Sequence, residues 1–101
     1  MILRPALIVL MLAPASALAQ TWPQQKCALF TEAWATSAPA EGKGAPSPGF
    51  RQKIEAFIAS GCETPRDACP ATKADVELAD ALALIVALEG MSTTFLPIAC
   101  P

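Results

Sequence analysis

Apolar residues recur at helical spacing in three segments of this chain, and no segment shows the two-residue alternation that is typical of a strand. The first segment covers residues 21–38, where Cys27, Phe30 and Trp34 are separated by three and four positions. That spacing places the three side chains on one face of a helix. Thr21 and the glutamine three residues later predict a capped N-terminus, and a proline at position 39 ends the segment.

The second predicted helix covers residues 47–60, and its apolar positions form a continuous stripe. The stripe consists of Phe50, Ile54, Phe57 and Ile58. Ser47 is a suitable N-cap, Pro48 suits the first helical position, and a glycine at position 61 ends the helix. Residues 39–49 contain three prolines and three glycines, so they predict a flexible connection between the first two helices.

The third predicted helix, from about Lys73 to Gly90, is the most apolar, and Thr72 and Asp75 have the spacing of a capping box at its start. At 100° per residue it has two separate apolar sides. The broad side consists of Leu78, Leu82, Ile85 and Val86, and the second stripe consists of Leu84, Leu88 and Met91. Either the other helices and the C-terminal tail cover both sides, or the second stripe stays exposed as a surface for a partner.

The first nineteen residues have the pattern of a cleaved secretory signal. Arg4 precedes a short apolar stretch, and Ala17 and Ala19 provide small residues at the −3 and −1 positions of a cleavage site. Cleavage there gives a mature chain that begins at Gln20, and the alternative is an uncleaved N-terminal anchor. We therefore expect residues 20–101 to form a single small domain in the periplasm or outside the cell.

Charge and hydropathy narrow the choice of partners. Residues 20–101 contain six Lys or Arg against nine Asp or Glu. A mildly acidic chain is a poor match for nucleic acid or for an anionic membrane surface. The longest apolar run of the third helix covers the eight residues 81–88, which is too short to span a membrane. We expect no stable membrane insertion after signal cleavage, and a protein as the partner.

The four cysteines, Cys27, Cys62, Cys69 and Cys100, predict two disulfides, because an exported small chain with an even cysteine count is usually cross-linked. A zinc site normally needs two closely spaced cysteine pairs, whereas the closest pair here is separated by six residues. A thioredoxin-like redox centre needs C-x-x-C in a βαβ unit, which the chain lacks. We expect no metal and no cofactor.

Antiparallel helices of this length bring all four cysteines to one end of a bundle. This arrangement favours Cys27–Cys62 together with Cys69–Cys100. The second choice is Cys27–Cys69 with Cys62–Cys100. A bond between Cys62 and Cys69 ranks third, because it closes only a local ring and ties no helix to another.

Catalytic residue types are scarce. The chain contains no histidine and no tyrosine, so Ser-His-Asp and Cys-His arrangements cannot form within it. Glu77 and Asp80 share a helix face and are interpreted as a solvated acidic strip rather than as a catalytic pair. We expect a protein that is not an enzyme.

The sequence therefore predicts an all-α fold, a small three-helix antiparallel bundle with an extended C-terminal tail and two disulfides. In this format it resembles small periplasmic acid-stress chaperones and certain exported immunity proteins of bacteria. We expect a non-catalytic interaction protein, such as a periplasmic partner, an inhibitor or an accessory subunit. The alternatives are an acid-stress-chaperone-like protein and a helical module for a small apolar ligand. The latter needs a closed cavity lined by Phe30, Trp34, Phe57 and Leu82.

We expect the purified mature chain to show no free thiol under denaturing conditions, because all four cysteines are cross-linked. Titration with a thiol reagent in denaturant, before and after reduction, measures this. Two or more reactive thiols before reduction would contradict the two disulfides and favour a metal site or a redox site.

Overall fold

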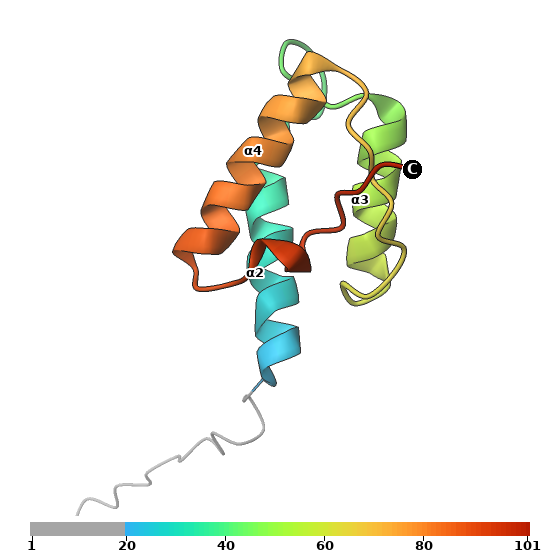
Figure 1. The fold of residues 1–101 in the computed structure, drawn as a ribbon. Coiled ribbons are helices and arrows are strands. Elements are labelled where there is room, and N and C mark those ends of the chain that lie inside the picture. The colour runs from blue at the N-terminus through green and yellow to red at the C-terminus, as the bar shows by residue number, and fades with distance from the viewer. Residues whose placement is uncertain (1–19) are drawn as a thin grey trace, which may run out of the picture.

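The chain folds into α-helices, as predicted. A computed structural model describes residues 20–101, and the predicted signal sequence at residues 1–19 lies outside the described residues. The elements are α2 (Trp22–Ser37), α3 (Pro48–Ala59), α4 (Lys73–Leu88) and a short 3₁₀ turn, η1 (Thr93–Phe95) (Figure 1). No strand occurs among these residues.

The helices begin at the caps that the sequence predicts. The Thr21 hydroxyl accepts a hydrogen bond from the Gln24 amide at 3.3 Å, and the Gln24 side chain accepts one from the Thr21 amide at 2.9 Å. The same reciprocal pair forms between Thr72 and Asp75 at the start of α4. Each pair satisfies two N–H groups that have no partner within the helix, so the start of the helix is fixed locally.

Two helices end at a glycine in the left-handed region, which side-chain-bearing residues rarely adopt. Gly61 follows α3 with φ 84°, and Gly90 follows α4 with φ 83°. In each case the next residue donates its amide back into the last turn, Cys62 to the Phe57 carbonyl at 2.9 Å and Met91 to the Val86 carbonyl at 2.8 Å. The chain is therefore turned back toward the helix that it has just left.

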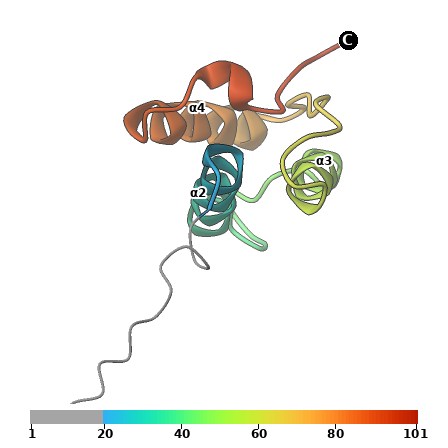
Figure 2. The same cartoon turned by 90° about the horizontal axis from the view of Figure 1, so that it is seen from below.

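The helix arrangement differs from the predicted antiparallel bundle. α2 and α3 run in opposite directions, but residues 60–72 then return along α3, so that α3 and α4 begin at the same end (Figure 1). In the view from below, α2 and α3 are seen nearly end-on while α4 lies lengthwise, so α4 crosses α2 instead of aligning with it (Figure 2). The prediction was wrong here because the connection 60–72 is long enough to carry the chain back along the whole of α3.

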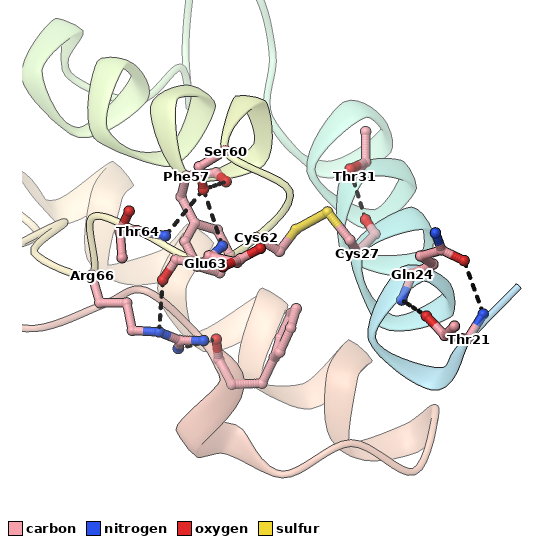
Figure 3. Close-up of a disulfide and its surroundings, with 11 residues drawn as sticks. Thr21, Gln24, Cys27, Thr31, Phe57, Ser60, Cys62, Glu63, Thr64 and Arg66 are labelled. Atoms are coloured by element: carbon pink, nitrogen blue, oxygen red, sulfur yellow. Dashed lines mark hydrogen bonds between the residues drawn. A yellow bond between two sulfur atoms is a disulfide. The ribbon is translucent and has the colours of Figure 1, made fainter.

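The disulfides join Cys27 to Cys62 and Cys69 to Cys100, which is the pairing ranked first. The cysteines do not all meet at one end, however. The first bond connects the start of α2 to the turn after α3 (Figure 3). The second connects the returning segment to the tail. Each bond closes a loop of more than thirty residues and stabilises the fold by about 3–4 kcal/mol in the loop-entropy model.

The tail is held beside the returning segment by backbone and side-chain contacts. Ala68 donates to the Pro97 carbonyl at 2.9 Å and accepts from the Ala99 amide at 3.1 Å, forming an isolated parallel bridge. Arg66 donates to the Phe95 carbonyl at 2.7 Å, and its guanidinium lies 5.1 Å from the centre of the Phe57 ring. These contacts place η1 against the helices.

Three phenylalanines from three different elements form the centre of the core. Phe30 of α2, Phe57 of α3 and Phe95 of η1 pack edge to face, with ring centres 5.6–5.9 Å apart. Edge-to-face packing is a favourable geometry for aromatic rings. Trp34 is also buried, at 5% exposure, and its ring centre lies 6.3 Å from that of Phe50.

A buried carboxylate joins the starts of α3 and α4. Asp75 is fully buried. One of its oxygens accepts from the Ser47 amide at 2.7 Å, and the other accepts from the Ser47 hydroxyl at 2.6 Å and from the amides of Ala71 and Thr72 at 2.9 and 3.2 Å. No cation pairs with it among the residues that the structure describes. The positive ends of two helix dipoles and four donors balance its charge instead.

These donors also determine the pKa of Asp75. Burial raises the pKa, because it disfavours the charged form, but the hydrogen bonds from Ser47, Ala71 and Thr72 outweigh burial and bring the pKa below its ordinary value of 3.8. The ionised form is therefore bound more tightly in the folded state than the protonated form. This stabilisation is complete above the unfolded pKa and is lost as the pH falls through the folded one.

We predict that Asp75→Asn lowers the free energy of unfolding at pH 7 by about 1–3 kcal/mol, because an amide nitrogen then faces buried donors. The loss should begin to shrink below about pH 4, where the carboxyl of the unfolded wild-type chain protonates, and should shrink further as the pH falls through the lower pKa of the folded state, whereas the asparagine does not titrate. Urea unfolding of both proteins at several pH values measures this. Asp80→Asn, at an exposed position on the same helix, is the control and should change stability by less than about 0.5 kcal/mol. A pH-independent difference between Asp75→Asn and wild type would contradict the assignment.

Candidate interaction surface

One face of α4 is exposed and largely apolar. Leu84 is 60% exposed and Leu88 is 76% exposed, whereas Leu82 and Val86 on the opposite side are completely buried. The exposed residues of this side, which we call the α4 outer face, are Lys73, Val76, Glu77, Asp80, Leu84, Ala87 and Leu88. Two neighbouring leucines with this exposure are unusual on a small chain whose other large apolar side chains are mostly buried.

Met91 does not belong to this surface, although the helical spacing predicted that it would. It is only 6% exposed and is part of the core. The reason is the turn at Gly90, which ends the helical rotation after Leu88 and folds Met91 back toward Val86. The exposed stripe therefore consists of Leu84 and Leu88, with Val76 two turns earlier at 48% exposure.

The charges on the outer face are negative except for Lys73 at its start. Glu77 and Asp80 are both exposed on the outer face, as expected for a solvated strip. Lys73 is the last basic residue of the sequence, so residues 74–101 contain no Lys or Arg. Within the described part of the chain, the ion pairs Arg51–Glu55 and Lys53–Asp67 lie outside α4.

A small hollow of about 160 Å³ lies between α2 and the end of α4. Its lining combines apolar side chains with two carboxylates and consists of Leu29, Glu32, Ala33, Thr36, Ile85 and Glu89. Ile85 is three residues from Leu88, and residues with that spacing are neighbours on a helix surface. The hollow therefore borders the α4 outer face.

A larger, open groove runs along α2 beside the Cys27–Cys62 disulfide. It has a volume of about 710 Å³, and its lining includes Ala28, Thr31 and Ala35 of α2 and Gly61 of the turn after α3. Figure 3 shows the disulfide connecting α2 to the turn after α3. The Thr31 hydroxyl donates a hydrogen bond to the Cys27 carbonyl, with a length of 2.7 Å. Its lining offers small side chains and few apolar anchors, so it is a weaker candidate than the outer face.

The side chains expected to line a closed ligand cavity fill the core instead. Phe30, Phe57 and Leu82 are completely buried, and all three belong to one cluster that also includes Trp34. Neither the hollow nor the groove is lined by any of them. The expected enclosed site is therefore not formed by these four residues.

Two kinds of feature are absent from residues 20–101, a cluster of metal ligands and a membrane-spanning helix. No three His, Cys, Asp or Glu side chains of this part lie close enough together to hold a metal ion. No helix of this part is both long and apolar enough to cross a bilayer. All four cysteines are in disulfides.

Two features of the structure were not predicted from the sequence. The wheel position of Asp75 signals burial, because Asp75 lies three and seven residues before Leu78 and Leu82 on the buried side. Only its capping role was predicted. The hollow between Glu32 and Glu89 has no sequence signal, because it depends on where α4 crosses α2.

No protein-family model, no curated protein and no solved structure matches the chain.

We predict that Leu88→Asp scarcely changes the melting temperature, because the side chain is already in water. Leu82→Asp should cost several kcal/mol and leave little folded protein, because it buries an unpaired carboxylate. Thermal unfolding of the two variants side by side measures the difference. Equal, severe destabilisation would show that the outer face is covered in solution.

Proposed function

We propose that this chain is an exported, non-catalytic interaction protein that binds a partner protein through the α4 outer face. The observation that carries the proposal is the exposure of Leu84 and Leu88 side by side, at 60% and 76%. Each Å² of apolar surface removed from water is worth roughly 25 cal/mol, so covering both leucines stabilises a complex. The partner is an envelope or secreted protein that this chain inhibits or assists.

Export is supported by two independent features. The pattern of residues 1–19 is that of a signal sequence, with small residues before Gln20. Two disulfides between distant segments persist only where the surroundings are oxidising, as in the periplasm or outside the cell.

A non-catalytic role is supported by the residue inventory. Histidine and tyrosine are absent from the sequence, and both disulfides remove the thiols that could act as nucleophiles. The alternative of a module for an enclosed apolar ligand has less support, because the four side chains expected to line its cavity belong to the packed core.

The proposal is tested by affinity capture from the cell envelope of the source cell, with the mature chain as bait. Wild type should retain one partner, and the double variant Leu84→Asp/Leu88→Asp should lose it by at least about tenfold while keeping its melting temperature. Ala28→Asp, in the groove along α2, is the matched control and should retain the partner. Retention by the double variant, or equal loss with Ala28→Asp, would reject the α4 outer face as the binding surface.

A further inference from the structure

We infer that the partner segment bound by the α4 outer face is a basic amphipathic helix. Its apolar side chains cover Leu84 and Leu88, and one Lys or Arg side chain enters the hollow between α2 and α4. This inference rests on the proposed function and specifies the chemistry of the partner at the same site.

The charge of the surface is the first ground. Every exposed charged residue of α4 after Lys73 is a carboxylate, and Lys73, at the start of the outer face, forms no ion pair with Glu77 or Asp80. Glu77 and Asp80 are on the outer face. Asp80 lies one turn before Leu84, and Glu77 lies two turns before it. A partner with Lys or Arg beside its apolar stripe gains attraction from these carboxylates, whereas an acidic partner is repelled.

The hollow is the second ground, and its lining combines two kinds of surface. Leu29 and Ile85 provide apolar walls, while Glu32 of α2 and Glu89 at the end of α4 provide two carboxylates from different elements. A long aliphatic side chain with a cationic end matches this combination, because its stem packs on apolar groups and its end pairs with an acid. The volume of about 160 Å³ suits one such side chain.

The spacing of the apolar side chains is the third ground. Leu84 and Leu88 are one turn apart, and Val76 lies two turns before Leu84 on the same exposed side. A helix that presents apolar residues at i, i+4 and i+7 has side chains one turn apart that can contact Leu84 and Leu88. Ala87 between the leucines is small and allows a close approach.

Two other occupants fit the surface less well. A second copy of the chain brings the same excess of carboxylates to the interface, Glu77 and Asp80 against one Lys73, so the two faces repel each other. An anionic lipid surface is repelled by the same carboxylates.

The test uses two synthetic helical peptides with the same leucines at i, i+4 and i+7, one flanked by lysines and the other by glutamates at the same positions. Fluorescence anisotropy with the disulfide-bonded mature chain gives the two dissociation constants. We expect the lysine peptide to bind at least about tenfold more tightly, and its affinity to fall as the salt concentration rises. Leu88→Asp should abolish binding of both peptides.

The hollow is tested by the double variant Glu32→Gln/Glu89→Gln. It should weaken the lysine peptide at least about fivefold, since it removes both carboxylates and keeps the side-chain shape. Glu41→Gln, at an exposed position in the loop before α3, is the matched control and should leave the affinity unchanged. Amide shifts of the labelled chain should concentrate on residues 76–89.

Several outcomes overturn the inference. Equal affinity for the two peptides rejects a basic partner. An unchanged affinity in Glu32→Gln/Glu89→Gln rejects the entry of a Lys or Arg side chain into the hollow. A dimer in sedimentation that Leu88→Asp dissociates assigns the face to a second copy. Binding to phosphatidylglycerol vesicles that depends on Leu88 assigns it to a membrane. If the envelope partner still requires Leu84 and Leu88 but the lysine preference is absent, the proposed function stands and only this inference fails.

Discussion

The Asp75 carboxylate is the contact on which the arrangement of the helices depends. It forms a capping box with Thr72 in the first turn of α4. It also accepts hydrogen bonds from the amide and the hydroxyl of Ser47, which is the N-cap of α3. A buried carboxylate without a cation is costly unless donors surround it, so the starts of α3 and α4 must stay together. This requirement makes the two helices begin at one end (Figure 1). α4 then crosses α2 with Leu84 and Leu88 exposed.

The disulfides and the tail complete a core that is small for the length of the helices. Cys27–Cys62 ties α2 to the end of α3, and Cys69–Cys100 ties the returning segment to the tail. Phe95 is thereby held between Phe30 and Phe57. Because the tail is used in this way, it covers the aromatic centre and leaves the outer face of α4 open. The exposed leucines are thus a consequence of how the chain closes its core.

The crossing of α4 over α2 also places an exposed apolar stripe next to an acidic hollow. It leaves an apolar stripe facing solvent, and beside it Glu32 and Glu89 meet at a hollow with apolar walls. Apolar area supplies affinity to an interface, while charges select among partners and speed their encounter. A basic helix satisfies both parts of the surface, which is why the proposed partner chemistry follows from the fold and from no single residue.

The sequence by itself determined the local structure. Thr21, Ser47 and Thr72 started the three helices, the glycines after α3 and α4 ended them, and the stripe that includes Phe57 and the one that includes Leu82 marked the core. These features depend on neighbouring residues, so periodicity and caps are enough to find them. The preferred disulfide pairing also agrees with the structure, although the single-end geometry used to derive it does not.

Only the tertiary structure decided the direction of α4, the hydrogen bonds from Ser47 to Asp75, the burial of Met91, and the hollow beside the outer face. Each depends on the path of the connection 60–72 or on the turn at Gly90, and helical spacing contains no information about where a connection leads. Met91 shows this most directly. The spacing that placed it beside Leu84 applies only while the helix continues, and the fold turns the chain inward one residue earlier.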